Sequence, residues 1–140
     1  MNILVDDTLL NKAAIIERCI RRVREEYAMC PGLDNYTNVD ALIMNIERAC
    51  QAAIDMANHI IALNHLGIPQ SSANSFELLA QASFIGKHIL KSMKAMTGFR
   101  NIAVHEYQEI KVDILKYISE QGYKDFILFC CEFGINIKEG

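Results

Sequence analysis

The chain has 140 residues, of which 51% are hydrophobic and 22% are charged, and its formal net charge is −3. This composition excludes a disordered chain and is typical of a single globular domain, 1–140, with a core of its own. The negative charge excludes a protein that coats nucleic acid, although it allows a local basic cleft.

Helical periodicity runs through the chain and strand patterns are scarce, so we predict an all-α fold. The first helix is expected to end near Cys30, where a Pro-Gly pair breaks the chain. Three neighbouring residues are good N-caps for it: Asp6, Asp7 and Thr8. The arginines between positions 18 and 24 lie one helical turn from glutamates, so we interpret them as self-neutralised surface.

The second helix is predicted over 39–66, between a capping Asn38 and a terminating Gly67. Such a helix is about 40 Å long, comparable with the diameter of a compact domain of this size. We therefore expect an elongated bundle that buries a helical stripe against a second protomer. Asp55 and His59 lie one turn apart on this helix, and we interpret them as a tethered Asp–His pair rather than as metal ligands.

Four further helices are predicted in the second half of the chain. Their ranges are 76–82, 87–97, 101–119 and 123–133, followed by a frayed tail at 134–140. Ser75 is expected to cap the first of them, Gly86 to mark the turn before the second, and Gly98 to end the second.

Several kinds of site are absent from the sequence. It contains no H-E-x-x-H, no phosphate loop and no G-x-S-x-G, so neither a metal nor a nucleotide cofactor is expected. The five cysteines form no C-x-x-C and indicate free thiols in a reducing cytoplasm. The first ten residues carry acids where a signal peptide carries bases, so we expect neither export nor a membrane partner.

One lysine-rich helical face leads toward an arginine. Lys87, Lys91 and Lys94 share this face, no acid lies between them, and the next basic residue is Arg100. Such a face is suited to guiding a phosphate backbone, but it is equally typical of an ordinary solvated surface.

The stretch "MTGFRNIAVHEYQEI" places Arg100, His105 and Tyr107 close together in the sequence. In an unbroken helix His105 would point about 140° away from Arg100, because each residue turns the helix by about 100°. Two arrangements would remove this difficulty. Either Gly98 ends one helix and Asn101 caps the next, which frees Arg100, or a two-fold dimer brings the histidine of one chain to the arginine of the other.

An arginine and a histidine suit the cleavage of RNA. The reaction needs a base for the 2′-hydroxyl and an acid for the leaving 5′-oxygen, and histidine titrates near working pH. It also needs a fixed cation where charge develops on the phosphate, which the planar guanidinium of arginine provides. This chemistry requires no metal.

The residues "GFRNIAVHEY" resemble the R-x-x-x-x-H-x-Y signature of the HepT-type toxins, a branch of the HEPN (higher eukaryotes and prokaryotes nucleotide-binding) ribonucleases. The segment "NHIIALNHLGIPQ" and the later "FELLA" also resemble the second and third helices of that family. The similarity spans most of the chain, from about Val39 to Tyr117.

The resemblance implies a bundle of about five helices that forms a homodimer, with a cleft between protomers that cuts RNA rather than DNA. Arg100 and His105 would be the catalytic pair. A neighbouring minimal nucleotidyltransferase, an MntA-like antitoxin, would transfer AMP from ATP onto Tyr107. Three residues are candidates for support or RNA contact: Asn101, Asp55 and Lys94.

The same motif is compatible with a different class of function. The chain would then be a non-catalytic subunit of a two-component nucleotidyltransferase, which binds a nucleotide or a partner without turning RNA over. A purely structural helical dimerisation module is a third interpretation.

Overall fold

The computed structural model describes residues 4–139, which form six α-helices and two short helical turns, without a strand in that range. The helices are α1 (Asp7–Met29), α2 (Tyr36–Leu63), α3 (Ser72–Gln81), α4 (Lys87–His105), α5 (Val112–Tyr117) and α6 (Lys124–Cys131). A 3-10 turn, η1 (Tyr107–Glu109), follows α4, and a π-helical turn, η2 (Ile118–Gly122), follows α5. The all-α prediction is confirmed. None of the helices within 4–139 has the length and apolar character that crossing a membrane requires.

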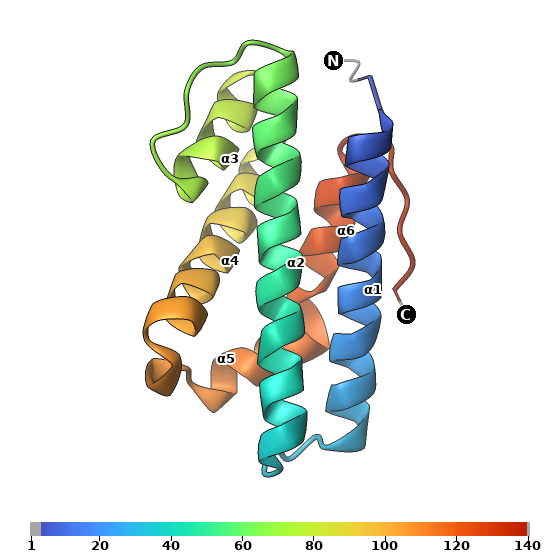
Figure 1. Ribbon diagram of the computed structural model, residues 1–140, viewed down its shortest axis with the longest axis vertical. Coiled ribbons are helices and arrows are strands. Elements are labelled where there is room, and N and C mark those ends of the chain that lie inside the picture. The colour runs from blue at the N-terminus through green and yellow to red at the C-terminus, as the bar shows by residue number, and fades with distance from the viewer. Residues whose placement is uncertain (1–3, 140) are drawn as a thin grey trace.

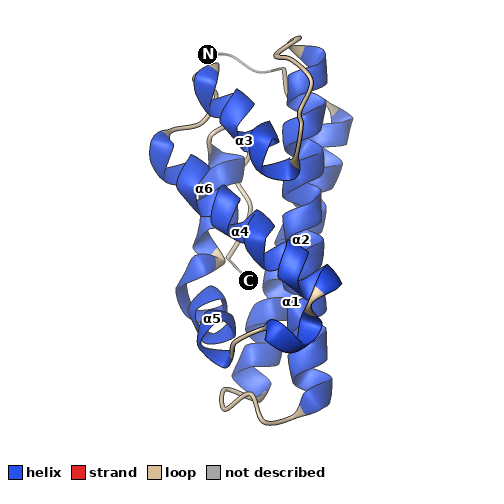
Figure 2. Ribbon diagram, turned by 90° about the vertical axis from the view of Figure 1, so that its left-hand side faces the viewer, coloured by secondary structure: helices blue, strands red, loops and turns tan. Residues whose placement is uncertain are grey.

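The two long helices lie side by side and antiparallel, and the long axis of the molecule follows α2 (Figure 1). Helices α3 and α4 pack on the other side of α2, and α4 leans away from it toward its own C-terminal end (Figure 1). The chain then reverses through η1 and α5, and α6 runs along the side of the molecule opposite α1 and α2 (Figure 2). The end of α4 and η1 therefore lie beside the first half of α2.

The core is centred on α2, which buries large aliphatic residues toward both ends and mostly small residues in its middle. Its alanines Ala49, Ala52, Ala53 and Ala57 are all at most 3% exposed, which allows the flanking helices to approach closely. Where α6 joins the core, the ring of Phe129 packs edge to face with two other rings. Its centroid lies 5.5 Å from that of Phe76 and 5.1 Å from that of Phe133. This geometry is the favoured one for aromatic pairs.

Helix starts agree with the sequence only in part. Asp6 caps α1, as predicted, and its Oδ1 accepts the backbone N–H of the residue three positions on at 3.0 Å. Helix α2 begins one turn earlier than predicted, because Asn35 and not Asn38 is the cap. Helix α3 is likewise capped by Ser71, while Ser75 lies buried and donates a hydrogen bond to an asparagine of α2.

The C-terminal tail lies along α1 instead of fraying (Figure 1). Ile135 is 7% exposed and belongs to the core. The backbone N–H of Lys138 donates to Glu17 at 2.6 Å, and Arg24 lies 3.1 Å from Glu139. The prediction of a frayed tail is therefore wrong for 134–139, because these contacts are distant in sequence; residue 140 lies outside the described range.

All five cysteines are free, and four of them are buried: Cys19, Cys30, Cys50 and Cys130. Burial raises the pKa of the Cys19, Cys50 and Cys130 thiols above the ordinary value. Only Cys131, on the last turn of α6, is exposed.

Candidate functional site

Arg100 lies inside a helix, not before one. Helix α4 continues without interruption from Lys87 through Gly98 to His105, so the predicted break at Gly98 is wrong. Glycine costs a helix interior only about 1 kcal/mol relative to alanine. The buried side chains of Met96 and Phe99, one on each side of Gly98 and both at most 7% exposed, pack on the core and keep the helix intact.

The guanidinium of Arg100 faces α2. Its Nε lies 3.9 Å from Oε1 of Glu47, and a quarter of the arginine side chain is exposed. The Nε atom is buried and has no hydrogen-bond partner among the described residues, because 3.9 Å is too long for a hydrogen bond. Glu47 therefore neutralises Arg100 electrostatically without occupying its donors, and the guanidinium keeps the capacity to bind a phosphate.

His105 is the last residue of α4 and its side chain is exposed. Five residues of unbroken helix separate it from Arg100, so the two side chains leave the axis about 140° apart. The structure thus does not bring the predicted catalytic pair together within one chain.

Tyr107 opens the 3-10 turn that follows α4, and its hydroxyl donates a hydrogen bond to Oδ1 of Asp40 on α2. Partial burial and the neighbouring carboxylate raise the pKa of Tyr107 to about 12, because both disfavour the phenolate. Tyr107 as a whole remains 46% exposed although its hydroxyl is held by Asp40.

A hollow of about 400 Å³ lies between the two helices at this point. It is lined by Asp40, Ile43, Met44, Glu47, Ala103, Val104 and Tyr107. Two carboxylates of α2 therefore each lie beside one residue of the motif: Asp40 contacts Tyr107, and Glu47 lies beside Arg100.

Sequence reasoning missed Asp40 and Glu47. A signal was present, since acids seven residues apart share one face of a helix, and this face of α2 is otherwise mostly apolar. The partner helix of that face was not evident from the sequence.

The three supporting candidates have other surroundings. Asn101 is an exposed residue within α4 and caps no helix, so its predicted capping role is wrong. Asp55 lies 3.1 Å from Lys12 of α1 and accepts a hydrogen bond from Gln51, so its carboxylate is turned away from α4. Lys94 forms an ion pair of 3.0 Å with an acid of α3, Glu77.

The lysine-rich face of α4 meets an acid from a neighbouring helix, because Lys94 pairs with Glu77 of α3. Asn74 and Lys94 hold the pKa of Glu77 below its ordinary value. The predicted pairing of His59 with Asp55 is wrong, because His59 pairs with Asp6 at 2.7 Å. Within 4–139 no three His, Cys, Asp or Glu residues cluster closely enough to hold a metal ion.

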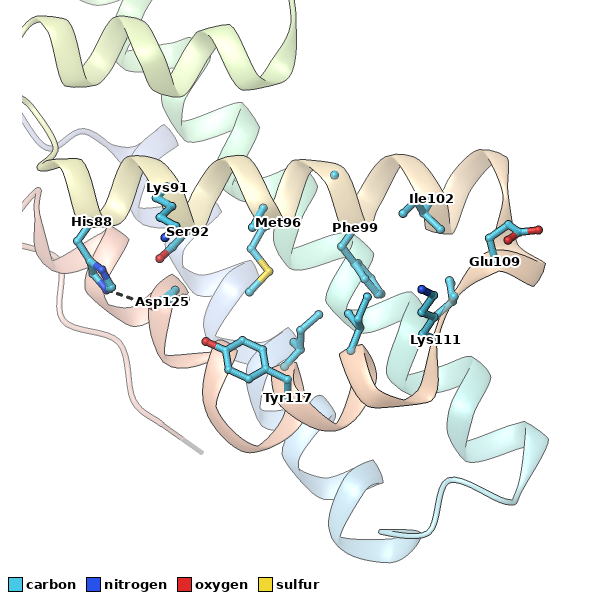
Figure 3. A pocket seen from close by; sticks show the side chains of 15 residues that line it. His88, Lys91, Ser92, Met96, Phe99, Ile102, Glu109, Lys111, Tyr117 and Asp125 are labelled. Atoms are coloured by element: carbon cyan, nitrogen blue, oxygen red, sulfur yellow. Dashed lines mark ion pairs between the residues drawn. The ribbon is translucent and has the colours of Figure 1, made fainter.

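A larger and more apolar hollow, of about 620 Å³, lies along a different face of α4, beside α5 and η2. Met96, Phe99 and Tyr117 project into it from opposite walls, and His88 and Asp125 approach to 4.0 Å at one end (Figure 3). His88 is 75% exposed, so this pair lies at the rim. None of Arg100, His105 and Tyr107 lines this hollow, and the motif end of α4 remains the candidate reaction centre.

The chain is similar to proteins of known function over nearly its whole length. A family model described as ribonuclease HepT-like matches residues 10–133. The mRNA nuclease HepT of Shewanella oneidensis is 43% identical over 126 residues, which cover 89% of this chain and 95% of that protein.

Solved structures show the same fold. A crystal structure of a toxin–antitoxin with AMP-PNP contains a chain 41% identical, with a TM-score of 0.88, covering 92% of this chain and 98% of its own. A structure of the tri-AMPylated Shewanella oneidensis HEPN toxin in complex with MNT antitoxin gives the same identity and TM-score, covering 93% and 98%.

Proposed function

Because the chain belongs to the HepT-like ribonuclease family, we propose that it is an endoribonuclease toxin whose activity is silenced by AMPylation of Tyr107. The observation that carries the proposal is the intact Arg100, His105 and Tyr107 set at the exposed end of α4. The whole chain works as a single domain, and its RNA substrate reaches this end from solvent.

The chemistry is a transfer within the RNA backbone. The 2′-hydroxyl attacks the adjacent phosphorus, the bond to the 5′-oxygen breaks, and the products are a 2′,3′-cyclic phosphate and a 5′-hydroxyl. His105 transfers protons to or from these oxygens, and Arg100 stabilises the charge that develops on the phosphate. These two groups accomplish the step without a metal ion.

The active unit in this proposal is a homodimer. Arg100 and His105 diverge by about 140° on one α4, so a single chain does not present both to one phosphate. A second copy related by two-fold symmetry supplies the missing group from its own α4.

The partner is a minimal nucleotidyltransferase antitoxin that transfers AMP from ATP to the Tyr107 hydroxyl. The relative solved as a tri-AMPylated toxin with MNT antitoxin supports this assignment, and so does the 46% exposure of Tyr107. An added phosphate two residues from His105 places negative charge where the RNA phosphate would bind. The five free thiols fit a reducing cytoplasm.

The test is RNA cleavage by the purified chain in the presence of a chelator. We expect cleavage with chelator, and its loss in Arg100→Ala and His105→Ala variants that keep the circular dichroism of the parent. Arg21→Ala and His65→Ala, which remove exposed residues of the same types elsewhere, are matched controls and should cleave normally.

Two results would contradict the proposal: cleavage that requires Mg²⁺, or cleavage that persists in both site variants. If the chain binds the antitoxin and a nucleotide but never cleaves RNA, the non-catalytic interpretation is correct instead.

A further inference from the structure

The hydrogen bond between Tyr107 and Asp40 joins two segments that are 67 residues apart in the sequence. Asp40 lies in the second turn of α2 and is exposed, as is Tyr107. The carboxylate contacts the one atom of Tyr107 that modification would convert, its hydroxyl oxygen. Asp40 therefore contacts the atom of Tyr107 that would react, and not only its ring.

The tyrosine needs help to act as a nucleophile. With a pKa of about 12, Tyr107 is neutral at pH 7, and only about one molecule in 100,000 carries the phenolate. A neutral phenol that attacks phosphorus must lose its proton as the new bond forms, because the oxygen otherwise becomes strongly acidic. The group that already accepts a hydrogen bond from this proton is Asp40.

The other titratable groups near Tyr107 are placed differently. Glu47, in the same hollow, lies beside Arg100, and the Tyr107 hydroxyl donates its hydrogen bond to Asp40 instead. His105, Glu106 and Glu109 are exposed neighbours in the chain, and none of them hydrogen-bonds the Tyr107 hydroxyl within the described residues.

We propose that Asp40 is the general base for nucleotidylation of Tyr107, so that the toxin contributes a catalytic residue to its own inactivation. This inference rests on the proposed function, because it requires that Tyr107 is the acceptor. The Tyr107 oxygen forms a bond to the α-phosphorus of a nucleoside triphosphate held by the antitoxin, and the bond from that phosphorus to the β-phosphate oxygen breaks. Pyrophosphate leaves, and the phenolic proton passes to the Asp40 carboxylate and then to solvent.

A structural role for Asp40 and a catalytic one make different predictions. The amide of Asp40→Asn still accepts a hydrogen bond and holds the tyrosine, but it does not accept the proton. Loss of the negative charge also lowers the pKa of Tyr107, so the variant must react through its small population of phenolate. A base role therefore predicts a slow reaction that accelerates with pH.

The experiment measures the rate at which antitoxin and MgATP add AMP to the full-length chain, by intact mass under single-turnover conditions with saturating antitoxin. At pH 7 we expect Asp40→Asn to react about 100- to 1,000-fold more slowly than the parent. Its rate should rise about tenfold per pH unit while that of the parent stays flat. Asp40→Glu should restore part of the rate, and added formate should accelerate Asp40→Ala.

Glu109→Gln, which removes a carboxylate from η1, is the matched control and should react at the rate of the parent. The inference is overturned if Asp40→Asn reacts within threefold of the parent at pH 7, which would place the base in the antitoxin. It is equally overturned if the lost rate does not recover with pH or with formate. Failure of the proposed function is distinguishable, because the parent chain itself would then gain no AMP on Tyr107.

Discussion

Glu47 and Arg100 face each other from neighbouring helices, with Oε1 of the acid 3.9 Å from Nε of the arginine. The same face of α2 makes a second contact with the motif, because Asp40, seven residues before Glu47, accepts a hydrogen bond from Tyr107, seven residues after Arg100. The arginine therefore lies beside a negative charge that repels an incoming RNA phosphate.

Replacement of Glu47 by glutamine is expected to strengthen RNA binding. The carboxylate competes with the phosphate for Arg100, so its removal should lower the KM for RNA about two- to fivefold with kcat unchanged. Steady-state cleavage kinetics measure both constants, and Glu25→Gln on α1 should leave them unaltered. A fall in kcat would show instead that Glu47 positions the arginine for the reaction.

Gly98→Ala should stabilise the protein. A Cβ at this position meets no atom within 4 Å, and the residue lies in the middle of α4. We expect the free energy of unfolding in urea to rise by about 0.5–1 kcal/mol. Gly134→Ala should do the opposite, because Gly134 has a φ of +76°, a backbone conformation that alanine adopts only with strain. Destabilisation by Gly98→Ala would mean that the helix breaks there after all.

The Tyr107 hydroxyl should titrate at unusually high pH. Its pKa in the folded protein is about 12, whereas an unfolded tyrosine loses its proton at pH ~10. The stabilisation that this contact provides is thus fully present below pH ~10 and is lost as pH rises through about 12. Phenolate absorbance of the parent minus that of Tyr107→Phe isolates this titration, which Asp40→Asn should move to lower pH. An ordinary midpoint in the parent would contradict the contact.

Two inactive variants should restore activity when they are mixed. If each site takes Arg100 from one protomer and His105 from the other, a dimer of one Arg100→Ala chain and one His105→Ala chain has one intact site. Random exchange of subunits then gives about a quarter of the parent's cleavage rate. Each variant alone is the control. No recovery, with exchange verified by mass spectrometry, would place both groups of a site on the same chain.

The sequence was sufficient for the fold class and the first helix, because these depend on periodicity and on local caps. It was sufficient for the family because the R-x-x-x-x-H-x-Y motif is intact. Asp6 caps α1 as its residue type and position suggested. The ion pairs of Arg22 with Glu25 and Glu26 likewise follow from helical spacing alone.

The end of α4 was not evident from the sequence. Gly98 marked a break that did not occur, because the packing of Met96 and Phe99 outweighs a local cost of about 1 kcal/mol. The actual end, at His105, contains neither glycine nor proline. Core packing sets the position of this helix end, since Ile110 and Leu115 reach the hydrophobic core only after the chain has reversed. Contacts across helices, such as Asp40 with Tyr107, depend on this reversal.

Because four of the five thiols are buried, the unaltered protein offers a single exposed cysteine for labelling. A maleimide-linked spin label will react at Cys131 and leave the buried cysteines untouched, because only Cys131 is exposed to the reagent. In an assembly of two copies the unaltered sequence therefore carries one label per chain, on α6 and away from the motif. Pulsed electron resonance between the two labels would measure the separation of the protomers before and after RNA or the antitoxin binds.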